Sequence, residues 1–193
     1  MARPREFDEG LVLGRALEAF RAKGFEGTTL DELEQATGLG RGSLYGAFGD
    51  KRSLFLKALA LYLDTALRER MARLQSDDAG RAEIVALFRS MARDAIGDRD
   101  RRGCMVTNCS IELADRDPDL ACQAARSLDQ FERAFAGAIR RSQRRGEIDP
   151  GRDPVRLARF LTVCMEGMQV LARIRPDPAW LDDVVAAVDE ALR

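Results

Sequence analysis

The 193-residue sequence contains no histidine, the side chain that most often serves as a general base or a metal ligand near neutral pH. No other catalytic constellation stands out, so we predict a protein that is not an enzyme and that needs no cofactor. No run of about 18 apolar residues is present, which excludes a transmembrane helix of ordinary length. Residues 1–10 are charged and precede no apolar stretch, so a secretory signal is not expected.

Cysteine is sparse, and the spacings typical of metal sites are missing. The alternating Asp115, Asp117 and Asp119 lack the glycine and the distal glutamate of a calcium loop, so they are expected to begin a helix. The four cysteines all lie in the second half of the chain without the close spacing of a zinc site. We therefore predict no metal site, and a reducing cytoplasm suits these thiols best. They are Cys104, Cys109, Cys122 and Cys164.

The formal net charge is only −1, although charged residues make up 33% of the chain. This near-neutral balance argues against a protein that coats nucleic acid without specificity. The local balance differs, because residues 38–57 hold four basic side chains against one acidic side chain, Asp50, which gives +3. The sequence therefore predicts one basic face on a neutral body. The four basic residues are Arg41, Lys51, Arg52 and Lys57.

Strand signals are also scarce, because β-branched residues are few and alternation over several positions is absent. Helical periodicity recurs instead, interrupted by clusters of glycine, proline and aspartate. We predict an all-α fold of about nine helices, with a three-helix head over residues 1–50 and a larger helical body over residues 51–193. The expected helices are 8–23, 29–37, a short helix between Gly38 and Asp50, a connecting helix over 51–74, and then 80–97, 104–114, 119–145, 154–174 and 178–192.

Residues 36–51, ATGLGRGSLYGAFGDK, contain five glycines, which raises the possibility of a phosphate-binding loop. Such a loop requires GxxxxGK followed by Ser or Thr after a buried strand. Here Gly46 is followed by Ala47, and an amphipathic helix precedes the segment. The dinucleotide pattern GxGxxG also fails, because Ser43 stands where the third glycine belongs. The phosphate-loop interpretation is therefore disfavoured.

A helix-turn-helix explains more of this segment. Two short helices meet at a turn that contains Gly38, and an apolar set is spaced to form their shared core. An ordinary helical corner with solvated charges is the alternative for any single residue. The coincidence of all of the features favours the helix-turn-helix. The predicted core residues are Leu33, Ala36, Leu39, Leu44 and Phe48.

The second helix of this motif leaves small and polar residues outside the core. Small side chains let a backbone approach the floor of a DNA major groove, which is about 12 Å wide. Arg41 is suited to a bidentate contact with guanine, and hydroxyl and ammonium groups nearby are suited to phosphate oxygens. The predicted DNA-binding residues are Thr28, Thr29, Arg41, Gly42, Ser43, Tyr45, Gly46 and Lys51.

The segment AFRAKGFEGTTLDELEQATGLGRGSLYGAFGDKRSLF resembles the DNA-binding domain of TetR/AcrR-type transcriptional repressors over about residues 8–57. The resemblance rests on the glycine–aromatic pair, Thr-Thr before the second helix, Gly-Leu in the turn, the Leu-Tyr-x-x-Phe core and the lysine two positions after Gly49. It implies a homodimer on a palindromic double-stranded operator and a body that binds a small, often apolar effector. Two departures weaken expected contacts: Gly40 replaces a frequent serine cap, and Gly46-Ala47 replaces a bulkier pair.

An effector site is expected among the apolar residues of the body. Methionine adapts to irregular cavities, and an amide among apolar walls orients a ligand. The alternative is that these side chains form the core or a dimer interface. The predicted effector residues are Phe88, Met91, Met105, Asn108, Glu112, Phe131, Met165, Met168 and Gln169.

Cys104 is a candidate redox residue in the segment RGCMVTNCSIELADRDP. A thiol in the first turn of a helix, with Arg101 and Arg102 just upstream, is expected to have a lowered pKa. The segment resembles a branch of the family that includes electrophile sensors. Cys109 is too far around the helix for an unstrained disulfide with Cys104. The alternative is a half-buried structural cysteine.

The last two long helices are expected to form the dimer interface, with internal packing as the alternative. We predict a cytoplasmic repressor whose effector tilts the connecting helix and spoils the spacing of the two heads. A thiol-sensing repressor is the alternative function, and a helical enzyme is a remote one. The predicted interface residues are Phe160, Val163, Gly167, Val170, Leu181, Val184, Val185 and Val188.

Overall fold

The computed structural model describes residues 7–113 and 115–193, and within these ranges every regular element is helical. This confirms the predicted all-α class, and most predicted spans agree with the observed ones to within a few residues. The elements are α1 (Glu9–Gly27), α2 (Leu30–Thr37), α3 (Arg41–Phe48), α4 (Lys51–Tyr62), the π-helical turn η1 (Leu63–Leu67), α5 (Arg68–Gln75), α6 (Arg81–Gly97), α7 (Met105–Leu113), α8 (Pro118–Arg144), α9 (Pro154–Ile174) and α10 (Pro178–Ala191).

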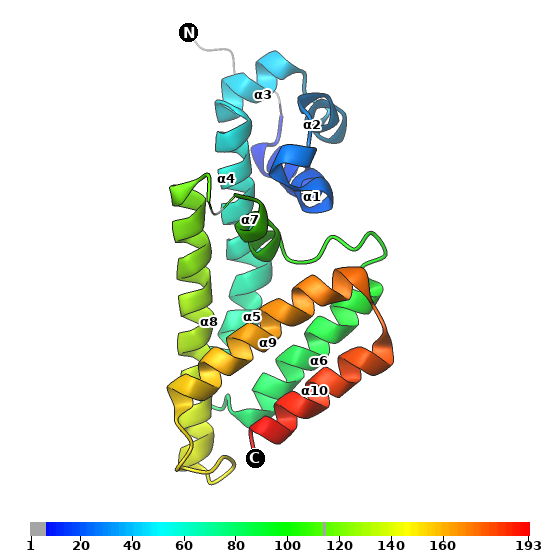
Figure 1. Cartoon of the computed structure of the whole chain (residues 1–193). Coiled ribbons are helices and arrows are strands. Elements are labelled where there is room, and N and C mark those ends of the chain that lie inside the picture. Colours follow the sequence, from blue (N-terminus) through cyan, green and yellow to red (C-terminus); the bar gives the residue numbers. More distant parts are fainter. Residues whose placement is uncertain (1–6, 114) are drawn as a thin grey trace.

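Helices α1–α3, here called the head, surround one end of a long connecting helix formed by α4, η1 and α5 (Figure 1). Helices α6–α10, here called the body, lie toward the other end, except that α7 and the start of α8 reach back to the head. Helix α8 runs beside α5, while α9 packs on α8 and α6. Helix α7 lies between the two parts and contacts both α1 and α8. Among the described helices, none combines the length and apolarity needed to cross a bilayer.

Aspartate or threonine side chains cap the N-termini of most helices, at positions where the sequence predicts helix starts. Thr29 accepts from the amide of Glu32, and the Glu32 carboxylate accepts from the amide of Thr29, which forms the predicted capping box. Asp50 caps α4 by accepting from the amide of Ser53. Three Asp-Pro pairs start α8, α9 and α10, with aspartate as the cap and proline in the first turn.

The head is built on an aromatic cluster that joins α1 to α4. The Phe20 and Phe55 rings meet edge to face with centroids 5.0 Å apart, and Phe25 lies 5.1 Å from Phe55. Phe25 reaches this position because Gly24 adopts φ 77° and ψ −178°, a conformation that is nearly restricted to glycine. Gly24 therefore ends the regular part of α1, as predicted. The predicted helix-turn-helix core is buried at Leu33, Leu44 and Phe48, with Leu39 packed against it.

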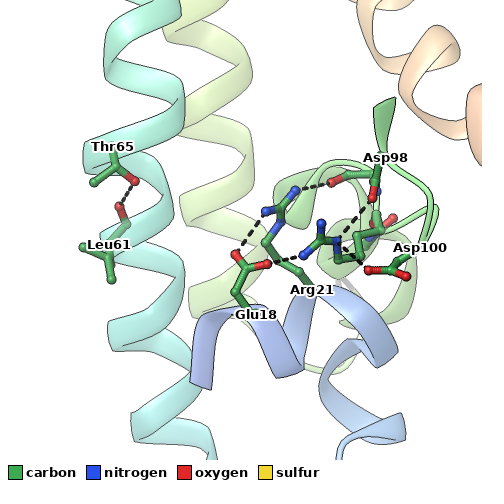
Figure 2. A network of polar contacts seen from close by, with 9 residues as sticks. Glu18, Arg21, Leu61, Thr65, Asp98 and Asp100 are labelled. Atoms are coloured by element: carbon green, nitrogen blue, oxygen red, sulfur yellow. Dashed lines mark hydrogen bonds and ion pairs between the residues drawn. The ribbon is translucent and has the colours of Figure 1, made fainter. Parts of the chain in front are cut away.

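The connecting helix is not uniform, in contrast to the single helix predicted over residues 51–74. Residues Leu63–Leu67 form a π-helical turn, and the Thr65 hydroxyl donates to the Leu61 carbonyl oxygen at 2.8 Å (Figure 2). Such turns are widened insertions that often mark functional sites. The turn begins directly after Tyr62, a buried residue that faces the junction between head and body.

The position of α10 corrects part of the predicted dimer interface. Helix α10 packs on α6 and α9 within the same chain, and its apolar stripe is used in that contact. These side chains fill the internal core, so they are not available to a second subunit. They are Leu181, Val185 and Val188, each at most 4% exposed, with Val184 partly buried beside them.

Candidate nucleic-acid interface and effector cavity

The outer face of α3 consists of exposed residues with small or polar side chains. Leu44 and Phe48 are buried and Ala47 is partly buried, while the other residues of α3 are exposed. A Cβ atom added at Gly42 or Gly46 would meet no other atom within 4 Å, so internal packing does not require glycine there. Each helical glycine nevertheless costs roughly 1 kcal/mol relative to alanine. The exposed predicted residues of α3 are Arg41, Gly42, Ser43, Tyr45 and Gly46.

The two threonines before α2 have different environments. Thr29 is exposed at the N-terminus of α2, where backbone amides and the helix dipole favour an anion. Thr28 is fully buried, and its hydroxyl donates to the Gly24 carbonyl oxygen at 2.6 Å. Its side chain therefore stabilises the turn after α1, and we correct its predicted role as a DNA contact.

The predicted basic face is smaller than the sequence indicates. Arg52 forms an ion pair with Asp117 at 2.7 Å and a second with Asp119 at 2.8 Å, both from the body. The Arg52 guanidinium lowers the pKa of Asp117 to about 2. Lys51 remains at the N-terminus of α4, with its ammonium 4.5 Å from the centroid of the Phe25 ring. Arg41 is thus the exposed cation of α3 itself.

A carboxylate of α7 holds the turn at the end of α1. Glu112 accepts from the backbone amide of Phe25 at 2.9 Å and from that of Glu26 at 2.6 Å. A Cβ atom on Gly24 would lie 2.6 Å from the same carboxylate, so the close approach depends on glycine. Glu112, predicted to bind an effector, is instead a contact between head and body.

The segment that precedes α7 forms a second contact with the head. Arg102 forms ion pairs with Glu18 of α1 and with Asp98, and the Arg21 guanidinium donates to the Gly103 carbonyl oxygen at 3.4 Å. Figure 2 shows Glu18 and Arg21 of α1 facing Asp98 and Asp100 across this junction. Together with Glu112 and Asp117, these contacts attach both ends of α7 to the head.

A cavity of about 420 Å³ lies at this junction, between α1, the connecting helix, α6, residues 97–103 and α9. Met91 and Gln169, both predicted effector residues, are part of its lining, together with Tyr62. Sequence reasoning missed most of the polar lining, although the arginines of GDRDRRG were visible in the sequence. Six arginines line the cavity, of which only Arg101 and Arg102 belong to that segment: Arg21, Arg70, Arg93, Arg101, Arg102 and Arg173.

The other predicted effector residues lie elsewhere. The Asn108 amide is engaged, because its nitrogen donates to the Arg102 carbonyl oxygen and its oxygen accepts from Arg173, both at 2.7 Å. Phe131 lines a groove between α5 and α8. The remaining residues are packed in the hydrophobic core, which fits the core alternative for them. They are Phe88, Met105, Met165 and Met168.

Cys104 precedes α7 and is only 5% exposed, so it is more enclosed than the sequence suggested. Arg102 is directed to Glu18 and Asp98, and it is not the partner of this thiol. Burial, with a smaller effect of the neighbouring Cys104, raises the pKa of Tyr62. Burial also raises the pKa of Cys109 to about 12. All four cysteines are free, and Cys122 is the exposed one.

An apolar stripe runs along the outer side of α9. Large hydrophobic side chains recur at helical spacing and remain exposed, while Gly167 and Val170 are partly buried between them. Exposed apolar stripes of this kind mark surfaces that associate with another protein. The exposed members are Phe160, Val163, Leu171 and Ile174.

Comparison with known proteins identifies both parts of the chain. Residues 12–58 match the family model described as bacterial regulatory proteins, tetR family, and residues 80–188 match the tetracyclin repressor-like C-terminal domain. The chain is 35% identical over 187 residues to the HTH-type transcriptional regulator YezE of Bacillus subtilis, covering 96% of each. It is 30% identical over 172 residues to the transcriptional repressor ComR of Escherichia coli, covering 89% of this chain and 82% of ComR.

Solved structures show the same fold. A cysteine mutant of the TetR family transcriptional regulator CifR, complexed with 26-base-pair operator DNA, superposes with a TM-score of 0.88 at 29% identity over the whole of both chains. The reduced form of NemR from Escherichia coli superposes with a TM-score of 0.80 at 19% identity, covering 95% of this chain and 96% of NemR. At 19% identity, the similarity to NemR concerns the fold alone.

Proposed function

The chain belongs to the tetR family of bacterial regulatory proteins, and from this membership we propose that it is a transcriptional repressor that binds a palindromic operator as a homodimer. The observation that carries the proposal is the outer face of α3, where glycines that packing does not require flank exposed Arg41 and Tyr45. A backbone without side chains at Gly42 and Gly46 allows α3 to lie close to base edges in the major groove.

Each exposed residue has a role in the proposed complex. Arg41 donates two hydrogen bonds to a guanine edge, and Ser43 is placed to contact a neighbouring base. Tyr45, Thr29 and Lys51 contact phosphate oxygens, which fixes the position of α3 without reading sequence. A DNA complex has been solved for CifR, whose fold this chain shares at a TM-score of 0.88, which supports this arrangement. Acting on an operator would place the protein in the cytoplasm.

The apolar stripe of α9 is the proposed dimer surface. Phe160 and Val163 are exposed on it, and Gly167 permits a close approach of two helices. Two heads held apart by such an interface would meet successive major grooves, about 34–36 Å apart. The apolar side chains of α10 are buried within the chain, so most of the apolar surface left among the predicted interface residues belongs to α9.

An effector in the body would act through α7. A ligand at the junction cavity displaces residues 97–103, and α7 carries the movement to the head through Glu112 and Asp117. The π-helical turn after Tyr62 is a point where the connecting helix can change direction. The effector needs only to bind the mis-spaced state a few kcal/mol better than the DNA-competent state.

Selection from sheared genomic DNA tests the function directly. The purified chain is incubated with the fragments at modest salt, and the retained DNA is sequenced. We expect enrichment of one short palindrome, whose neighbouring genes would suggest the effector. Retention of no fragment, or of all fragments equally, would refute the proposal of a sequence-specific repressor.

Arg41→Ala should weaken operator binding by about 1–3 kcal/mol and relax the preference at one base pair, because the bidentate contact to guanine is lost. Binding to a set of operators with single base changes measures both effects. Arg126→Ala, which removes an exposed arginine of α8, serves as the charge-matched control and should leave binding unchanged. Equal weakening on every operator would show that Arg41 contacts only phosphate.

Val163→Glu should convert the dimer to a monomer, because it places a charge in the middle of the proposed α9 interface. Light scattering at several protein concentrations measures the mass. Ile111→Glu is the matched control, since Ile111 and Val163 are both 71% exposed and Ile111 lies on α7 outside the stripe. A dimer that persists in Val163→Glu but dissociates in Ile111→Glu would place the interface elsewhere.

A thiol-sensing repressor is the second candidate, favoured by the position of Cys104 directly after Gly103 in the cavity wall. A maleimide in the cavity would react through its carbon–carbon double bond: one carbon would bond to the Cys104 sulfur, and the other would take up a proton in place of the one that the thiol loses. Cys104→Ser should then abolish release from the operator by N-ethylmaleimide without changing operator affinity. Cys122→Ser is the control, because Cys122 is the exposed thiol. Unchanged release in Cys104→Ser would eliminate the sensor.

A further inference from the structure

We propose that the junction cavity binds a small organic carboxylate, so that the effector of this protein is an anion with an apolar body. The charges in the cavity wall are unbalanced, because six arginines and two aspartates, Asp94 and Asp98, give a net charge of +4. A concave site lined by one sign of charge concentrates ligands of the opposite sign. The volume of about 420 Å³ falls in the usual range of small-molecule sites.

Two of the cationic side chains are available for a ligand. The guanidinium groups of Arg93 and Arg101 make no hydrogen bond or ion pair with any residue in 7–113 or 115–193, although both line the cavity. Arg101 is also held at φ 52°, an unusual backbone conformation for a residue other than glycine. Guanidinium groups bind carboxylates through paired, charge-assisted hydrogen bonds.

The other arginines are already engaged within the chain: Arg173 donates to the Arg101 carbonyl oxygen and to the Asn108 amide oxygen, and the rest pair with carboxylates. Arg102 pairs with Glu18 and Asp98, and Arg70 pairs with Asp94 at 2.7 Å. The wall thus already contains carboxylate–guanidinium contacts of the kind that a ligand carboxylate would make. The Nε atom of Arg21 is enclosed and has no hydrogen-bond partner among the described residues. Because that atom is buried, the donors left for an anionic group are those of Arg93 and Arg101.

The rest of the wall argues for an organic anion and against inorganic phosphate. Met91, Ala95 and Ala172 contribute apolar surface, and the Tyr62 ring lies 5.4 Å from the Arg21 guanidinium carbon. Gln169 contributes an amide that can bind a polar substituent. An apolar body attached to a carboxylate uses both surfaces, whereas phosphate uses only the charged one.

A bound carboxylate would also act on the junction. It competes with Glu18 and Asp98 for the guanidinium groups that attach α1 to residues 97–103. Loss of those pairs weakens the contact between head and body at the N-terminal end of α7. This consequence for DNA rests on the proposed repressor function, whereas binding of the anion does not.

Isothermal titration calorimetry on the full chain without DNA tests the site. The probes are acetate and benzoate, each compared with its uncharged amide, acetamide or benzamide, at constant ionic strength. We expect benzoate to bind at one site per chain. It should bind about tenfold or more tightly than benzamide, which lacks the charge, and than acetate, which lacks the apolar body. Sodium phosphate, the inorganic anion, should bind more weakly than benzoate.

The double variant Arg93→Gln/Arg101→Gln should lose about tenfold or more in benzoate affinity, and circular dichroism confirms that it is folded. Arg126→Gln is the control and should bind benzoate as the natural chain does. The inference is overturned by the absence of benzoate binding, by equal binding of benzoate and benzamide, or by undiminished binding in the double variant. A chain that binds its operator but no carboxylate overturns only this inference, and one that binds benzoate but no DNA overturns only the repressor.

Discussion

The contact on which the rest of the structure depends is the carboxylate of Glu112 between two backbone amides of the head. Phe25 and Glu26 donate to it at 2.9 and 2.6 Å, directly after the conformation that Gly24 alone permits. Hydrogen bonds to a charged group are worth about 1.5–3 kcal/mol, more than ordinary ones. The turn that starts the helix-turn-helix is therefore stabilised by a residue 86 or 87 positions later in the chain.

This contact gives α7 a central position in the account of regulation. One end of α7 follows the arginine-rich segment that lines the junction cavity, and the other leads to Asp117, which holds Arg52 at the start of α4. In the proposed function, a ligand in the cavity or a modified Cys104 would therefore act on the same short helix that contacts the head. Allosteric coupling requires an element that contacts both sites and has two arrangements, and α7 with its flanking residues makes the contacts to both the head and the cavity.

The sequence predicted the structural features that depend on residues close together along the chain. The capping box at Thr29, the Asp-Pro starts and the buried Leu33, Leu44 and Phe48 all follow from local spacing. Roles set by distant partners were not predictable in this way. Thr28 is buried by the path of α1, and the stripe of α10 faces α6 instead of a second subunit. The cavity is likewise lined by residues of α1, α6 and α9. Periodicity within one helix does not indicate which arginines of different helices lie close together.

Amide hydrogen exchange at Phe25 and Glu26, followed by NMR in the natural chain and in Glu112→Ala, tests whether α7 holds the head. We expect both amides to exchange about tenfold or more faster in the variant, since each loses its acceptor. Glu190→Ala, an exposed carboxylate of α10, should leave them unchanged. Equal protection of both amides in Glu112→Ala and in the natural chain would show that α7 does not hold the head.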